Sequence, residues 1–568
     1  MANDYDTNRN EIDTLADQAL ENLEPPHPLL DISVWHLLTT AEDQIRMFFA
    51  GWIPNKQMHL LSIVDNLKYA LRHSISDVSK KTKNEKITLP QKTIPKAYEQ
   101  ASKLLIASEK YETLSRLIAS TYNSRGKFIK SGEDYELEYS DLVDIRYSVL
   151  EGLGHGADVS PDITGVLHRW LTIESKNYEE QLIATKIFES VRVKKGRVAY
   201  KYNEHVAYGI AKQIPQRDEV IPDDFVFSWG AAYKTHALIN SLLVRCLYHV
   251  LAVEFAARKL SLKGGAESSL LLVISKEQLC TDLQQLANFS DQDVCAFIDM
   301  LTYGNNALTP DIALQPLFLS KSGLLMIPCY HILNSNVQRN LLALLAKISP
   351  KKFDTQSSCF ENHMVSKIQP SLKNWNQTVL NKEFKVRGQK EEIDGLILDK
   401  QNKTILLLEL RWILQPGDAR EVYNKIKVTS EKVDQLSRKI NFVKKNFSEI
   451  VSRAFGESID VSKENDWCVK GVVVVQGFGG TVSHDEDIPV VTMDILCKGL
   501  RKFNKLDSLY LWIKQLSWLP VQGIHFDVEN VIEDNELVKV SRLAARTLVN
   551  QLEFTSSLQK NIAENSTT

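Results

Sequence analysis

Two carboxylates and one arginine stand inside two neighbouring apolar segments of the sequence. Asp394 belongs to segment 393–398, while Glu409 and Arg411 belong to segment 404–413, which reads TILLLELRWI. Because side chains alternate along a strand, Glu409 and Arg411 project from the same face. Burying an unpaired carboxylate costs several kcal/mol. We therefore expect the two acids to have a partner that compensates their charge.

The tetrapeptide 400–403 joins the two segments, so an antiparallel hairpin is the simplest connection. Asp394 near the start of one strand then lies close to Glu409 near the end of the other. Two clustered carboxylates repel each other unless a cation lies between them, and Mg²⁺ binds one or two carboxylates together with water and phosphate oxygens. The pair predicts a phosphodiester-cleaving site that uses Mg²⁺ or Mn²⁺. Taken singly, each acid also fits a plain structural role, as a same-face ion pair or a strand-entry residue.

A helical stripe upstream offers a third carboxylate. Phe360, Met364 and Ile368 recur at helical spacing, and Glu361 falls at the edge of that apolar face. We expect Glu361 to face the same core as the acid pair. Pro370 is expected to kink or end this helix.

Downstream, a long helix is predicted over 420–453, followed by strands at 469–476 and 488–493. Outside its apolar stripe, the helix carries nine basic and four acidic side chains. Such a helix can lay positive charge along a phosphate backbone, although a solvated helix face also explains a basic run.

The order of these elements and of the spaced acids resembles the PD-(D/E)XK nuclease superfamily, which has the restriction-endonuclease-like fold. The resemblance covers residues 355–500 and rests on Glu361, Asp394 and the triplet Glu409-Leu410-Arg411. It implies that Asp394, Glu409 and the backbone carbonyl of Leu410 hold the metal. It also implies that Glu361 matches the first-helix carboxylate of the family.

Arg411 stands where the family usually has lysine. Arginine stays protonated, so Arg411 can stabilise developing negative charge but cannot act as a base. Lys425 and Lys427 are candidates for phosphate contact or for a lysine that replaces the missing one. Gln435 lies on the helix where some branches of the superfamily place a glutamine near the site.

Composition limits the broad class of the protein. With 568 residues, 43% hydrophobic and 24% charged, the chain predicts a soluble multidomain protein. A net charge of -3 means that nucleic-acid binding must depend on a local basic surface. The seven cysteines include no CxxC pair, which argues against a disulfide framework or a thiolate zinc site and favours a cytoplasmic location. No signal peptide or membrane-spanning segment is indicated.

The expected organisation is a mostly α-helical N-terminal region followed by an α/β domain with a small mixed sheet. The segments are an acidic flexible lead-in at 1–27, a mostly helical region at 28–265, a helix-turn-helix-hairpin segment at 266–350, the nuclease-like domain at 355–500 and a C-terminal helical extension at 501–568. The third segment has the order of a winged helix, which many helical proteins share without binding DNA. Residues 562–568 are expected to form a loose tail.

Two functions follow from these observations. The first is a metal-dependent nuclease acting on DNA or RNA, with DNA favoured, in defence against foreign nucleic acid or in repair. The second is a catalytically inactive nuclease-fold protein that binds nucleic acid or acts as a scaffold, which the arginine at 411 favours. The helical N-terminal region would serve recognition, homo-oligomer formation or contact with partner proteins.

Overall fold

The structure is a computed structural model that combines helices with several small sheets. It describes residues 2–21, 23–50, 57–81, 88–121, 126–139, 143–158, 178–214, 220–260, 262, 265–306, 309–375, 377–414, 419–456, 466–477, 487–534 and 538–566. The chain divides into two compact units. Unit 1 comprises residues 1–118, 158–355 and 535–538, and unit 2 comprises 119–157, 356–534 and 539–568.

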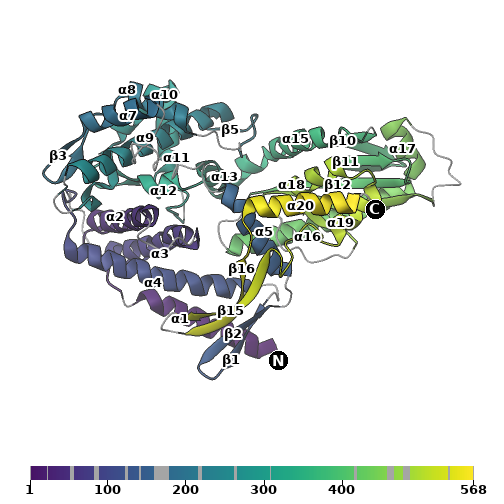
Figure 1. The fold of residues 1–568 in the computed structure, drawn as a ribbon, viewed down its shortest axis with the longest axis horizontal. Helices are drawn as coiled ribbons and strands as arrows, with labels where there is room; N and C mark the ends of the chain where they lie inside the picture. Colours follow the sequence, from purple (N-terminus) through teal and green to yellow (C-terminus); the bar gives the residue numbers. More distant parts are fainter. Residues whose placement is uncertain are drawn as a thin grey trace. The chain divides into compact units, whose positions relative to one another are not determined.

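Unit 1 is mostly helical (Figure 1). Its helices are α1 (Ala2–Glu21), α2 (Leu30–Phe49), α3 (Gln57–Lys81), α4 (Pro95–Ser120), α7 (Tyr178–Ser190), α8 (Glu204–Gln213), α9 (Ala232–Lys259), α10 (Lys276–Ala287), α11 (Asp291–Leu301), α12 (Cys329–Leu333), α13 (Val337–Ile348) and α14 (Pro350–Asp354). The flexible lead-in expected at the N-terminus is instead helix α1, in which Ile12 and Ala16 are buried. These two residues lie one turn apart, so an apolar stripe exists within the acidic segment.

Helix α9 is a long core helix of unit 1. It is the one described helix with the length and composition to cross a membrane, and 94% of its most apolar window is buried inside the protein. Two short hairpins precede it, β3 (Arg192–Lys194) with β4 (Arg197–Ala199) and β5 (Val226–Phe227) with β6 (Gly230–Ala231).

The helix-turn-helix-hairpin segment follows α9. Strand β7 (Leu271–Ser275) leads into α10 and α11, and β8 (Phe318–Leu319) and β9 (Leu324–Pro328) complete a sheet of order β7-β9-β8. The hydroxyls of Ser275 and Ser290 cap the two helices, and Asn288 takes a left-handed conformation between them. The helix-turn-helix-hairpin order expected for 266–350 is therefore present.

Unit 2 is built on a five-stranded sheet of order β10-β11-β12-β13-β14. Its strands are β10 (Thr378–Val386), β11 (Gln389–Asp399), β12 (Thr404–Ile413), β13 (Cys468–Gly477) and β14 (Val490–Thr492). The β11–β12 hairpin is antiparallel as predicted, whereas β12, β13 and β14 are parallel to one another. Strand β10 is not apparent in the sequence, because it is an edge strand whose side chains are mostly half-buried or exposed.

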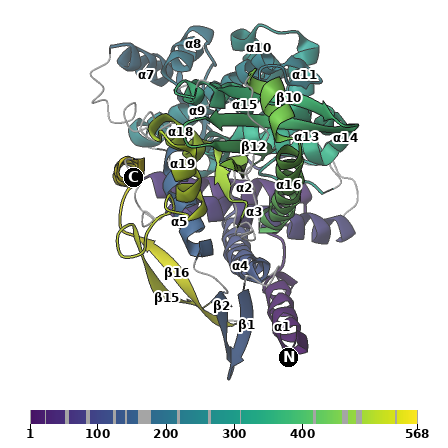
Figure 2. The ribbon, with the colours of Figure 1, turned by 90° about the vertical axis from the view of Figure 1, so that its right-hand side faces the viewer.

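Helices cover both faces of this sheet. Helices α15 (Ser357–Ile368), α18 (Met493–Lys502) and α19 (Leu506–Lys514) share a core with Leu408 and Leu410, whereas α16 (Ala419–Lys445) and α17 (Phe447–Phe455) share one with Leu407. Figure 2 shows α16 and α19 on opposite sides of β12. The helix predicted over 420–453 is thus present but divided at Asn446. As expected, α15 ends before Pro370, where the chain continues as the 3-10 turn η3 (Gln369–Leu372).

The C-terminal segment differs from the helical extension that we expect for 501–568. After α19 it forms β15 (Phe526–Asp534) and β16 (Lys539–Thr547), which join β1 (Gly126–Ser131) and β2 (Asp134–Tyr139) in a sheet of order β1-β2-β16-β15 (Figure 1). Helix α5 (Val143–Asp158) follows β2. The final helix α20 (Gln551–Ser566) includes residues 562–566 of the predicted loose tail, because Ile562 packs into the core of unit 2.

Candidate functional site

The two predicted acids meet where the β11–β12 ladder ends. The last paired residues are Gly395 and Leu408, and Asp394 and Glu409 occupy the next opposed positions in the same register. Beyond this pair the side chain of Asp394 replaces a backbone carbonyl as acceptor: its Oδ2 accepts a hydrogen bond from the backbone N–H of Leu410 at 2.7 Å. The strand end therefore fixes the Asp394 carboxylate beside Glu409.

A backbone irregularity turns Asp394 toward helix α16. The β10–β11 ladder skips the pair formed by Asn381 and Asp394, and Asn381 has a left-handed φ of 45°. On either side of this point Ile393 and Leu396 reach the same hydrophobic core, although regular alternation would put them on opposite faces. The alternation of β11 therefore inverts at Asp394.

Two lysines of α16 neutralise the acids. Lys432 Nζ donates to Glu409 Oε1 at 2.6 Å, and Lys439 Nζ donates to Glu409 Oε2 at 2.5 Å and to Asp394 Oδ1 at 3.4 Å. Glu409 is completely buried and Lys439 is 3% exposed. The two lysines are seven residues apart, which is close to two helical turns, so they lie on one face of the helix. One ammonium thus contacts both carboxylates.

A close approach of α16 to the sheet makes these contacts feasible. A Cβ atom added to Gly471 of β13 would lie 2.9 Å from Leu436 Cδ2 and 2.7 Å from Ile440 Cδ1. Leu436 and Ile440 flank Lys439 on the helix. The missing side chain at Gly471 therefore lets the lysine reach the buried end of the hairpin.

The electrostatics of the site show incomplete compensation. Burial, followed by the charge of Glu409, raises the pKa of Asp394 to about 6 from its ordinary 3.8, although Lys439 and the Leu410 N–H act in the opposite direction. Burial by itself would lower the pKa of Lys439, but Asp394 and Glu409 together raise it above its ordinary value. Two positive charges thus face two negative ones, and Asp394 still retains a proton more readily than an exposed carboxyl.

The backbone adds a further oxygen to the site. The N–H and C=O groups of one strand residue point to the same side, since a residue of a hydrogen-bonded antiparallel pair exchanges both bonds with its partner. The Leu410 N–H points to Asp394, beyond the end of the β11 ladder. The Leu410 carbonyl therefore points to the same side of β12 as Asp394.

The structure does not bring every predicted residue to the pair. Arg411 lies half-buried on β12, and its Nε is buried without a hydrogen-bond partner among the described residues. Glu361 lies on α15, whose Met364 and Ile368 pack on the opposite face of the sheet. In the described part of the chain, no group of three His, Cys, Asp or Glu side chains could hold a metal ion. Glu361 thus does not join the acid pair, contrary to our expectation.

The three residues of α16 that the sequence predicts as nucleic-acid contacts lie in different environments. Lys427 is exposed, and the side chain of Lys425 lies outside the described residues. Gln435 is half-buried and lies between Lys432 and Lys439 on the same helix face. The two lysines that contact the acids are not apparent in the sequence, although their seven-residue spacing beside apolar positions is a usable signal.

Comparisons with the models of known protein families, with curated proteins and with solved structures find no match for this chain. The function of the site must therefore be inferred from its own chemistry. That chemistry is a buried carboxylate pair, a backbone carbonyl and two lysines at the end of a strand hairpin.

Proposed function

We propose that unit 2 is a divalent-metal-dependent nuclease of the restriction-endonuclease-like fold, which hydrolyses phosphodiester bonds of DNA or RNA. The observation that carries the proposal is the contact of one cation, the Lys439 ammonium, with a carboxylate oxygen of both Asp394 and Glu409. The mixed sheet with helices on both faces supports it as well, because the acids occupy two adjacent inner strands, β11 and β12, in the order of the family.

The residues present fit a divalent ion. The Lys439 ammonium indicates that the space between the carboxylates accommodates a positive charge, and the Leu410 carbonyl points to the Asp394 side of β12. Mg²⁺ and Mn²⁺ take oxygen ligands of this kind, with water and phosphate completing the set. When bound, such an ion would polarise the phosphodiester and favour attack by water. The raised pKa of Asp394 is consistent with carboxylates that lack sufficient positive charge.

The basic residues supply the other functions of the site. In this proposal Lys439 supplies at the acid pair the ammonium that the lysine of the triplet supplies in the family, although Lys439 comes from a helix and not from the strand of Glu409. Lys432 holds the second oxygen of Glu409 and thereby fixes the orientation of that carboxylate. Arg411 lies two residues beyond Glu409, where its permanent charge stabilises negative charge that develops on the phosphate.

The complete pairing of the acids favours a second candidate function. Glu409 has both oxygens bonded to lysine ammonium groups, and the two lysines balance the two carboxylates in formal charge. A protein that needs no metal can retain this arrangement as a buried structural network. Unit 2 would then bind nucleic acid or act as a scaffold without cleaving it.

A cleavage assay tests the first function. Labelled single- and double-stranded DNA and RNA are incubated with the full chain and Mg²⁺ or Mn²⁺, and the wild type is compared with Asp394→Asn and Glu409→Gln. We expect each substitution to lower cleavage by about 10²-fold or more, as for the loss of a group that stabilises transition-state charge. Glu391→Gln is the matched control, because Glu391 is on the same strand and pairs with Arg438 of the same helix, outside the acid pair. Absence of cleavage on every substrate, or full activity in Asp394→Asn, would contradict the proposal.

Metal dependence separates the two candidates. A nuclease should gain thermal stability with Mn²⁺, and Glu409→Gln should abolish the gain. A silent binder should retain nucleic acid equally in Mn²⁺ and in a chelator. Arg411→Lys should leave a nuclease active, since Lys439 already provides an ammonium at the carboxylates.

A further inference from the structure

Two cysteines of unit 1 lie in direct contact although they are far from any CxxC spacing. Cys280 on α10 and Cys295 on α11 have their Sγ atoms 2.8 Å apart. This separation is less than one ångström longer than the ~2.04 Å bond of a disulfide. Cys280 is 6% exposed, whereas Cys295 is half-buried and reaches solvent.

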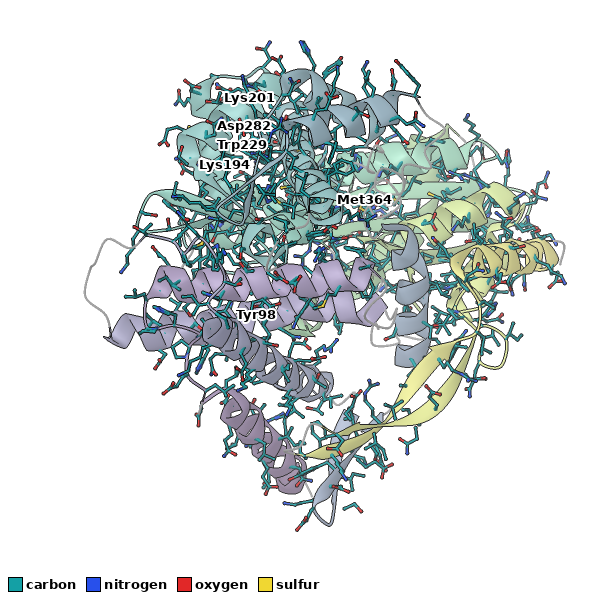
Figure 3. The ribbon with its side chains drawn as sticks, turned by 60° about the vertical axis from the view of Figure 1, so that its left-hand side comes forward. Tyr98, Lys194, Lys201, Trp229, Asp282 and Met364 are labelled. Atoms are coloured by element: carbon teal, nitrogen blue, oxygen red, sulfur yellow. The ribbon has the colours of Figure 1, made fainter. Side chains whose placement is uncertain are left out.

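Both helices are anchored to the same part of unit 1. Arg245 of α9 forms a buried ion pair with Asp282 of α10, at 2.6 Å. Trp229 packs edge-on against Phe297 of α11, with ring centroids 5.6 Å apart. Figure 3 labels Asp282 and Trp229 among the side chains of unit 1. Asp282 follows Cys280 by two positions, and Phe297 follows Cys295 by two positions. The fold therefore holds the two sulfur atoms next to each other without a bond between them.

We propose that Cys280 and Cys295 are a reversible oxidation site, which a hydroperoxide converts to a disulfide between α10 and α11. The Cys295 thiolate attacks one peroxide oxygen, the O–O bond breaks, and water or an alcohol leaves while a sulfenic acid forms on Cys295. Cys280 then loses its proton and attacks the Cys295 sulfur. The S–S bond forms as the S–O bond breaks, and a water molecule leaves. Two electrons pass from the two thiols to the peroxide, and a dithiol reductant reverses the reaction.

The order of these steps follows from exposure. Cys295 meets a dissolved oxidant first because its side chain is the more accessible of the two. Burial, followed by the neighbouring sulfur, raises the pKa of Cys280 to about 12, so Cys280 acts as the resolving thiol after Cys295 has been oxidised. A sulfenic acid beside a second sulfur forms a disulfide in preference to further oxidation.

A second cysteine pair provides an internal contrast. Cys246 and Cys329 are also hydrogen-bonded to each other, but both are completely buried. An oxidant cannot reach this pair in the folded protein. Cys468 is exposed and reports the general reactivity of an accessible thiol toward the same oxidant. The proposal therefore predicts a selective reaction among the described cysteines.

The test uses the reduced full chain treated with increasing hydrogen peroxide. Remaining thiols are alkylated in denaturant, and the peptides are mapped by mass spectrometry. We expect a crosslink between Cys280 and Cys295, with loss of two hydrogens, in most molecules at peroxide levels that leave Cys246 and Cys329 reduced. Dithiothreitol should restore both thiols. The proposal is overturned if both thiols stay reduced while Cys468 is oxidised, or if each is oxidised separately without a crosslink.

Two variants assign the roles. In Cys280→Ser, Cys295 should accumulate sulfenic acid that a dimedone probe captures, because the resolving thiol is missing. In Cys295→Ser, Cys280 should stay reduced. Hydrogen exchange of the wild type provides a measurement that needs no substitution: the crosslink should slow exchange in residues 276–301. Unchanged exchange in these residues after peroxide treatment would contradict formation of the crosslink in the folded protein.

Discussion

Replacement of Lys439 by methionine tests the central contact of the candidate site. Methionine keeps an unbranched side chain but removes the ammonium that both carboxylates share. Glu409 is completely buried and Lys439 is 3% exposed, so water cannot replace the lost charge. Removal of one member of a buried ion pair costs about 3–5 kcal/mol. Because Lys432 still bonds Glu409, we expect the lower limit, about 3 kcal/mol.

The assay is thermal unfolding of Lys439→Met in a chelator and in Mn²⁺. In a unit of this size, a loss of about 3 kcal/mol lowers the Tm by roughly 6–12 °C in the chelator. An ion at a hundred times its Kd stabilises the folded state by about 2.7 kcal/mol, so saturating Mn²⁺ should recover most of the loss. Arg438→Met is the control, since Arg438 lies beside Lys439 but is 63% exposed, and its pair with Glu391 is worth about 0–1 kcal/mol.

Two results would refute this reasoning. An unchanged Tm of Lys439→Met in the chelator would mean that the ammonium does not compensate the buried carboxylates. A lowered Tm that Mn²⁺ fails to raise would mean that the carboxylates do not share a metal ion. The second result would favour the silent binder over the nuclease.

Three further predictions concern the same site. The pKa of Asp394 is about 6 in the folded protein, against an ordinary 3.8. Between about pH 4 and pH 6 the folded state therefore binds more protons than the unfolded state. The free energy of unfolding should fall by at most about 3 kcal/mol as the pH rises across this range. Metal binding requires the ionised carboxylate, so Mn²⁺ stabilisation should increase as pH rises through about 6, which urea titrations at several pH values would measure. Gly471→Val should push α16 away from β13, lower the free energy of unfolding by about 1–3 kcal/mol and reduce cleavage relative to the wild type. The backbone of Asn381 has a φ of 45°, which glycine adopts easily and valine does not. Asn381→Gly should therefore preserve or raise the free energy of unfolding, whereas Asn381→Val should lower it by about 1–3 kcal/mol. Denaturant midpoints of the two variants would measure the difference.

The hairpin that carries the acids is predictable because its determinants are local. Strands β11 and β12 are continuous apolar runs, and a four-residue link between them favours antiparallel pairing. The register that opposes Asp394 and Glu409 then follows from the length of the turn. Strand β13 is predictable for a related reason, since its run of valines favours a buried parallel strand.

The features that the sequence does not reveal depend on contacts between distant segments. Strand β16 pairs with β2, and the two are separated by about 400 residues, so nothing in the local pattern of either predicts the sheet. The strands β15 and β16 are half-exposed, and cross-strand ion pairs such as Arg542 with Glu533 stabilise them in addition to the few apolar side chains that they bury, such as Phe526. The contact between Cys280 and Cys295 similarly depends on how α10 and α11 pack.

The lysines of the site illustrate the same limit at the level of chemistry. On sequence alone, interest falls on Arg411, because it stands at the position where the resembled family has lysine. In the folded chain the ammonium at the carboxylates comes from Lys439, thirty residues after Glu409, and it arrives there because α16 packs closely against Gly471. A basic run on an amphipathic helix ordinarily indicates a solvated face, yet here one of its members is nearly completely buried. The charge that a site requires is thus a property of a position in space, so an arginine in the strand motif is not by itself evidence that the site lacks a lysine.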